Sequence, residues 1–203
     1  MTYSYLALGD SYTIGELVPF YENFPNQTIQ LLRKHFKETH HFSAAEIMAK
    51  TGWTTDELMH QMSDTAFLPK YDLVSLLIGV NNQYRGLAIE NFKTEFTLLL
   101  QKAIEFSGGN NNRVFVLSIP DWGVTPFAAD RDASIIATEI DAFNLACKEI
   151  AEQHGCTFID ITSSQRVDGA NAEFLAEDKL HPSGKEYAKW AEKLFERVVF
   201  KCL

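Results

Sequence analysis

The chain has 203 residues, of which 46% are hydrophobic and 22% are charged, and it carries 18 Lys and Arg against 27 Asp and Glu. This length fits a single domain spanning residues 1–203, and the apolar content excludes an intrinsically disordered chain. The formal net charge of -9 offers no positive field to nucleic acid or to an anionic membrane surface. Neither is therefore expected as a partner.

No stretch of the sequence has the length and apolar character of a membrane-spanning helix. The longest apolar run, Leu73–Val80, is far shorter than the roughly 20 residues that a span needs. The first residues do not resemble a signal peptide, because Asp10 interrupts the early apolar run. We therefore expect a cytoplasmic protein without a membrane anchor, with reduced thiols at Cys147, Cys156 and Cys202.

Short apolar runs alternate along the chain with longer stretches of helical period. The short apolar runs predict buried strands, and apolar residues spaced three and four positions apart predict helices. In chain order these elements are a strand at Tyr3–Leu8, a weaker strand near Phe42–Met48, a helix opened by a capping box at Thr54 and Glu57, a strand at Asp72–Ile78, a helix over Ile89–Phe106, a strand at Arg113–Ser118, a helix over Ile136–Ile150, a strand at Thr157–Asp160 and a helix over Tyr187–Val198. This alternation predicts a parallel sheet with helices on both faces and a site in the loops after the strands.

Three of these loops carry residues that can take part in chemistry. Ser11, in Gly9-Asp10-Ser11, is well placed as a nucleophile, but it can equally cap a helix or belong to a phosphate-binding loop. Asp10 is expected to brace that turn. Gly52 lets the backbone offer its N–H to a ligand, or it simply forms a turn. The amide of Asn81 can donate to developing negative charge, although Asn also favours turns.

A fourth segment near the C-terminus pairs a carboxylate with a histidine. Asp178 stands three residues before His181, ahead of the last predicted helix. At that spacing the carboxylate can accept from one ring nitrogen and leave the other free as a base, although a surface pair is the plainer interpretation of these two residues alone. Together the four segments supply the nucleophile, oxyanion donors, base and orienting carboxylate that acyl transfer requires.

The order of these segments resembles the SGNH (GDSL-type) hydrolases, an esterase and lipase family named for Ser, Gly, Asn and His in four separate blocks. The third block of the family usually reads Gly-x-Asn-Asp, whereas Asn82 replaces the final Asp here. In the family that Asp is expected to tether neighbouring loops, and an Asn can accept a hydrogen bond but lacks the charge that strengthens it. The positions that match the family blocks are Ser11, Gly52, Asn81 and His181, with Asp178 before it.

The resemblance implies a three-layer α/β/α, flavodoxin-like fold with a parallel sheet of about five strands in the order 2-1-3-4-5. It also implies a serine esterase in which His181 takes the proton of Ser11 while Asp178 steadies the imidazolium. The backbone N–H groups of Ser11 and Gly52 and the amide of Asn81 then form the oxyanion hole. The family chemistry needs no metal or organic cofactor, and its partner is a small-molecule ester. No particular oligomeric state is predicted.

Several side chains in or near the same loops are candidates for contact with substrate, namely Tyr12, Trp53, Asn82, Trp122 and Phe127. Aromatic rings there can bind an acyl chain or stack on a sugar, or they can cap the edge of the core. The resemblance allows lysophospholipids, thioesters, simple esters and acetylated sugars as substrates. Because an acidic chain without an anchor is poorly suited to an anionic bilayer, small or medium-chain soluble esters are expected.

Three alternatives stay open at this point. The first is a carbohydrate O-deacetylase of the same family. The second is a flavodoxin-like domain that holds a phosphate in the Ser11 loop, and the third is a non-catalytic SGNH-like domain that binds a sugar or ester without turnover. A phosphate-binding domain leaves Asp178 and His181 without a role, and only an enzyme needs an activated serine.

Overall fold

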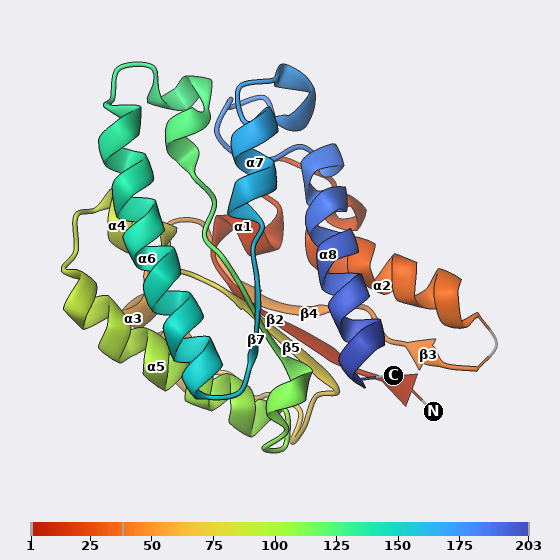
Figure 1. Cartoon of the computed structure of the whole chain (residues 1–203). Helices are drawn as coiled ribbons and strands as arrows, with labels where there is room; N and C mark the ends of the chain where they lie inside the picture. The colour runs from red at the N-terminus through yellow and green to blue at the C-terminus, as the bar shows by residue number, and fades with distance from the viewer. Residues whose placement is uncertain (1, 38, 203) are drawn as a thin grey trace.

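The computed structural model describes residues 2–37 and 39–202 and has a five-stranded parallel sheet with helices on both faces (Figure 1). Its strands, in the spatial order β4-β2-β5-β6-β7, are β4 (Glu46–Ala49), β2 (Tyr5–Gly9), β5 (Leu73–Leu77), β6 (Val114–Leu117) and β7 (Thr157–Ile159). Numbered by their place in the chain, these five strands follow the order 2-1-3-4-5. The predicted flavodoxin-like, three-layer α/β/α fold is confirmed.

The helices form the two outer layers of the molecule (Figure 1). On one face α2 (Phe24–Phe36) packs against α8 (Gly184–Cys202), and on the other α5 (Ile89–Phe106) lies between α3 (Thr55–Ser63) and α6 (Ala133–Gln153). The capping box predicted at Thr54 is present, because the Glu57 carboxylate accepts the Thr54 backbone N–H at 2.9 Å. The apolar stripes predicted for α5, α6 and α8 face the core, as the burial of Phe96, Phe143 and Trp190 shows.

Short helices occupy the connections between these elements. Three are α-helical, namely α1 (Ser11–Ile14), α4 (Val80–Tyr84) and α7 (Thr162–Asp168). Five are 3₁₀ turns, namely η1 (Phe20–Glu22), η2 (Asn111–Arg113), η3 (Trp122–Val124), η4 (Pro126–Ala128) and η5 (Ala172–Phe174). Because α1, α4 and η3 follow the carboxyl ends of β2, β5 and β6, their side chains gather at one edge of the sheet.

The first predicted strand is divided into two in the structure. β1 (Thr2–Tyr3) pairs with β3 (His41–Phe42) in a separate two-stranded sheet, and the main sheet begins with β2. Ser4 lies between β1 and β2, and its backbone N–H donates to the Asp72 carboxylate at 3.0 Å. The weaker prediction near residues 42–48 likewise covers the end of β3 and most of β4. Apolar residues occur on both sides of such a break, so their pattern does not predict where one strand ends and the next begins. Tertiary contacts determine that position.

The core explains why the strands could be predicted from short apolar runs. β2, β5 and β6 are buried along their whole length, as expected for parallel strands covered on both faces. Cys147 and Cys156 are buried free thiols, while the side chain of Cys202 lies outside the described residues. Within the described part of the chain, no helix combines the length and the apolar character that crossing a membrane requires.

Candidate active site

Three of the predicted residues meet at the carboxyl edge of the sheet. Ser11 is the first residue of α1, directly after β2, whereas Asp178 and His181 lie between η5 and α8. His181 Nε2 lies 2.9 Å from Ser11 Oγ, and His181 Nδ1 lies 2.6 Å from Asp178 Oδ2. Hydroxyl, imidazole and carboxylate thus form one continuous hydrogen-bonded chain. In that arrangement a histidine can accept a serine proton while the carboxylate fixes its tautomer.

The segment that carries the histidine is a tight turn organised by Asp178. Its Oδ1 accepts the backbone N–H groups of Leu180 and His181, both at 3.0 Å, while Oδ2 faces the imidazole. Burial alone raises the pKa of Asp178, but the hydrogen bonds from the His181 ring and from these two backbone groups outweigh it and hold the pKa below its ordinary value. Asp178 is therefore ionised where it meets the imidazole.

Asp10, next to the serine, has a different environment. It is fully buried and caps α1, accepting the Tyr12 backbone N–H at 3.0 Å. Burial raises the pKa of Asp10 to about 7, although the hydrogen bond from Tyr12 acts in the opposite direction. The carboxylate thus braces the turn that presents Ser11, which is the part expected of it.

Gly52 and Asn81 border the same pocket as Ser11. Gly52 has a φ of +84°, a left-handed conformation that favours glycine. A Cβ added there would meet only the Arg85 guanidinium, at 3.7 Å, so conformation and not space accounts for the glycine. Asn81 lies in α4, just after β5, and its Nδ2 donates to the Trp53 carbonyl at 2.9 Å. This hydrogen bond fixes the amide against the loop that carries Gly52.

Two further contacts hold these loops in place. Arg85 donates to the Gly52 carbonyl at 2.5 Å and lies 3.4 Å from the Glu57 carboxylate. Asn82 is buried; its Oδ1 accepts the Thr55 backbone N–H at 3.1 Å and its Nδ2 donates to the Thr55 hydroxyl at 2.7 Å. An asparagine thus provides the loop tether expected of an aspartate at this position. The structure places it behind the pocket and not in the pocket lining, where a substrate contact would lie.

The pocket beside Ser11 has a volume of about 210 Å³. Of the aromatic candidates, Tyr12, Trp122 and Phe127 line it, whereas Trp53 packs against the core instead. Four lining residues were not among the predicted site residues, namely Thr51, Val80, Tyr84 and Leu180. All of them are near neighbours of motif residues, and helical spacing from Asn81 is a signal that could have identified Tyr84.

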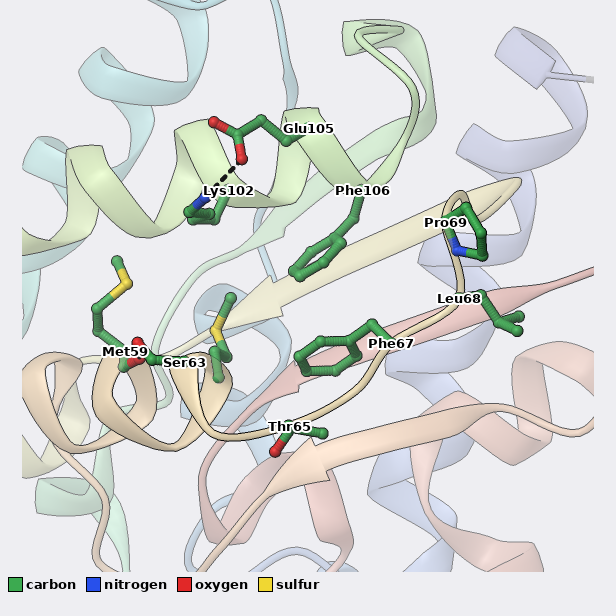
Figure 2. Close-up of a pocket in the computed structure, with 10 residues that line it drawn as sticks. Met59, Ser63, Thr65, Phe67, Leu68, Pro69, Lys102, Glu105 and Phe106 are labelled. Carbon is green, nitrogen blue, oxygen red and sulfur yellow. Dashed lines mark hydrogen bonds and ion pairs between the residues drawn. The ribbon is translucent and has the colours of Figure 1, made fainter.

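A larger hollow, of about 620 Å³, lies between the end of α3, the loop after it and the last turns of α5 (Figure 2). The Phe67 and Phe106 rings approach to 4.7 Å between centroids, and Lys102 pairs with Glu105 at 2.6 Å. The described residues that line this hollow include neither histidine nor cysteine, and none of them lines the Ser11 pocket. Across residues 2–37 and 39–202, no group of three or more His, Cys, Asp or Glu side chains is arranged to hold a metal ion.

A Ser–His–Asp chain at the carboxyl edge of a parallel α/β sheet is an arrangement found among serine hydrolases. The GDSL-like lipase/acylhydrolase family matches residues 7–189, and the chain belongs to this family. It is a serine esterase or acylhydrolase, which confirms the resemblance seen in the sequence.

Individual relatives are similar over nearly their whole length. The spore germination lipase LipC of Bacillus licheniformis is 25% identical over 211 residues, which cover 96% of this chain and 95% of that protein. The lipase Lip_vut3 from a goat rumen metagenome superposes with a TM-score of 0.76 at 22% identity, covering 96% of this chain and 97% of that one. The acetylxylan esterase Axe2 of Geobacillus stearothermophilus superposes with a TM-score of 0.75 at 16% identity, covering 99% of this chain and 96% of that one. At such identities the two structures establish a shared fold.

Proposed function

We propose that Ser11 is the nucleophile, His181 the general base and Asp178 the orienting carboxylate with which this chain hydrolyses a carboxylic ester. The observation that carries the proposal is the hydrogen-bonded chain of 2.9 Å from Ser11 to His181 and 2.6 Å from His181 to Asp178. His181 Nε2 takes the hydroxyl proton as Oγ attacks the carbonyl carbon, and it then gives that proton to the leaving alcohol. Water repeats the sequence on the acyl-enzyme and releases the acid.

The developing oxyanion is held, in this proposal, by the backbone N–H groups of Ser11 and Gly52 and by the side-chain amide of Asn81. One hydrogen of Asn81 Nδ2 is engaged by the Trp53 carbonyl at 2.9 Å, while Asp10 Oδ2 lies at 3.5 Å. The second contact is long for a hydrogen bond, so a negatively charged oxygen in the pocket can replace it. Donors fixed before the reaction stabilise the transition state without reorganisation.

The substrate proposed is a small or medium-chain soluble ester, acylesterase- or lysophospholipase-like in class. A pocket of about 210 Å³ is smaller than the roughly 300–1,000 Å³ typical of sites for drug-sized ligands, which supports a short acyl group. The net charge of -9 supports soluble esters over those of an anionic bilayer. We further propose that residues 1–203 work as one domain in the cytoplasm, where buried free thiols such as Cys147 and Cys156 stay reduced.

A second substrate class, acetylated carbohydrates, is supported by the rim of the pocket. The Tyr84 and Phe127 side chains line the pocket and are 49% and 47% exposed, so that a sugar ring can stack on them. Turnover of an acetylated xylo-oligosaccharide compared with a p-nitrophenyl ester series distinguishes the two classes.

The proposed mechanism is tested by covalent labelling of the folded protein with a fluorophosphonate probe. We expect rapid modification of a single serine, identified by peptide mass as Ser11, and protection from labelling by p-nitrophenyl acetate, because only an activated serine reacts quickly. A flavodoxin-like or non-catalytic domain predicts no fast labelling. Modification of a different serine, or none, would contradict the assignment of Ser11.

A further inference from the structure

Three aromatic side chains, Tyr84, Trp122 and Phe127, form one part of the Ser11 pocket. The Trp122 ring lies 5.2 Å from Tyr84 at 69° and 6.2 Å from Phe127 at 70°, so it is the shared member of two edge-to-face pairs. Only 5% of Trp122 is exposed, whereas about half of each partner is exposed. Trp122 is therefore the inner wall of the pocket, and the other two rings form its rim.

The orientation of the Trp122 ring is set by Gln83. The indole Nε1–H donates to Gln83 Oε1 at 2.8 Å within the interior. The other end of the same amide, Nε2, donates to Glu139 Oε2 at 2.7 Å. Gln83 is buried in α4 and Glu139 belongs to α6, so one amide joins α4, α6 and the loop after β6. A buried indole N–H that lost this acceptor would be left unsatisfied, which disfavours the present ring position.

The backbone around Trp122 is fixed by contacts that do not involve Gln83. The Asp121 carboxylate pairs with Arg166 Nε at 2.8 Å and accepts the Gly123 backbone N–H at 2.9 Å. Gly123 lies so close to α6 that an added Cβ would be 2.9 Å from Ile136. Loss of the Gln83 amide is therefore expected to release the indole ring without releasing the loop. Gln83 does not line the pocket and acts only through the ring it holds.

We propose that Gln83 is a positioning residue that holds Trp122 as the wall against which the acyl chain packs, and that it thereby sets chain-length preference. This inference rests on the proposed function, because it requires the Ser11 pocket to receive the acyl group. Because Ser11 and Trp122 line the same pocket, we expect a hexanoyl chain on Ser11 to contact the wall and an acetyl group to contact it little. Each buried methylene contributes roughly fourfold to affinity, so losing contact with about two of them raises KM about fifteenfold.

The first test is the replacement Gln83→Leu, measured with p-nitrophenyl acetate and p-nitrophenyl hexanoate. We expect the KM for hexanoate to rise about fifteenfold with little change in kcat, while acetate turnover stays within about twofold. Gln101→Leu, at an exposed position of α5, is the matched control and is expected to leave both substrates unchanged. A parallel change in acetate and hexanoate turnover would overturn the inference.

A second pair of variants keeps the test valid if Gln83→Leu does not fold. Gln83→Glu retains an acceptor for the indole but brings a carboxylate against Glu139, where two like charges repel. Adding Glu139→Gln restores the hydrogen bond between the two side chains. In the double variant the amide at position 139 donates and the carboxylate at position 83 accepts, the reverse of the parent. We expect the single variant to raise the hexanoate KM at neutral pH and the double variant to return it to within about twofold of the original value. Failure of this rescue would overturn the inference.

A spectroscopic readout connects the kinetics to the ring itself. The chain has three tryptophans, so the Trp122 indole N–H can be assigned in a ¹H–¹⁵N spectrum with Trp122→Phe. Its hydrogen exchange is expected to be slow in the parent and the double variant and at least about tenfold faster in Gln83→Leu. Fast exchange with an unchanged hexanoate KM would overturn the role of the ring. An unlabelled Ser11 would instead disprove the proposed function.

Discussion

Two hollows of the molecule, the one beside α3 and α5 and the Ser11 pocket, differ in size and in the polar groups that line them. The larger one, of about 620 Å³, is walled by methionine and phenylalanine side chains and carries an ion pair whose Lys102 and Glu105 side chains are 50% and 63% exposed. The smaller one, of about 210 Å³, has Ser11 and His181 in its wall. Both side chains are largely buried, and a hydrogen bond joins them. The hollow to which we assign the reaction is therefore distinguished by polar groups that converge at the strand ends, and not by its volume.

The largest difference between the two hollows is expected when one serine is removed from each, Ser11 from the smaller and Ser63 from the larger. Ser11→Ala is expected to lower kcat for p-nitrophenyl acetate by roughly 10⁴- to 10⁶-fold, because the nucleophile is lost. Ser63→Ala removes a hydroxyl that only donates to the Met59 carbonyl, and it is expected to leave kcat within about twofold. Circular dichroism shows whether both variants are folded. Full turnover by folded Ser11→Ala, or a large loss in Ser63→Ala, would reverse the assignment of the two hollows.

A smaller effect is expected from the amide of Asn81. Asn81→Ala should lower kcat by roughly 100- to 1,000-fold with little change in KM, as expected for a donor that acts on the transition state. Lys102→Ala, in the other hollow, breaks only an exposed ion pair and should change neither kcat nor stability measurably. If the Asn81→Ala loss appears entirely in KM, the amide binds substrate and does not stabilise the oxyanion.

The buried carboxyl under Ser11 predicts a pH dependence of stability. Because the pKa of Asp10 is raised to about 7, the folded state keeps a proton that the unfolded chain releases near its ordinary pKa. The resulting contribution of Asp10 to the free energy of unfolding is complete below the pKa that Asp10 has in the unfolded chain. It is lost as the pH rises through about 7. Asp178, whose pKa is lowered, contributes stability that is lost only as the pH falls into the acid range below its unfolded pKa.

Urea unfolding between about pH 5 and pH 8 measures this effect. The midpoint of the parent is expected to fall as the pH rises, and Asp10→Asn should flatten that fall because an amide does not titrate. Asp64→Asn, at the exposed end of α3 beside the larger hollow, is the matched control and should keep the slope of the parent. An unchanged slope in Asp10→Asn would show that Asp10 is ionised throughout this range.

The smallest effect is expected at the loop that carries Gly52. Arg85→Ala removes the hydrogen bond to the Gly52 carbonyl and the exposed ion pair with Glu57, and it should lower kcat/KM roughly fivefold. Arg131→Ala, at an exposed arginine outside the pocket lining, should have no effect. An Arg85→Ala loss as large as that of Asn81→Ala would mean that the arginine contacts the substrate.

The sequence alone predicts the strands of the sheet well, because they are buried on both faces and stand out as short apolar runs. Their spatial order comes from the resemblance to the family and not from these runs. The motif residues can also be located from the chain, since Ser11 and Asn81 each come just after a predicted strand and His181 comes before the last helix. The break at Ser4 is not predicted, because apolar residues continue on both sides of it and the change of sheet depends on the contact with Asp72.

The walls of the pocket are the part that the sequence predicts poorly. Trp53 and Trp122 both follow a strand end and both pack on the core, yet only Trp122 also lines the Ser11 pocket. What separates them is side-chain direction, which depends on partners such as Gln83, 39 residues away from Trp122. Asn82 shows the same limit, since one amide in a loop can face either a substrate or the Thr55 backbone. Local spacing does not encode contacts of this kind.

The hydrogen bond between Ser11 and His181 joins residues 170 positions apart in the chain. Ser11 follows β2, the first strand of the main sheet along the chain, and His181 precedes α8, which docks on α2 near the start of the chain. A nascent or partly folded chain therefore holds its serine without the imidazole that would activate it. Under the roles proposed for Ser11 and His181, labelling of Ser11 reports that the last segment has docked, and hydrolytic activity is expected only once that segment has folded.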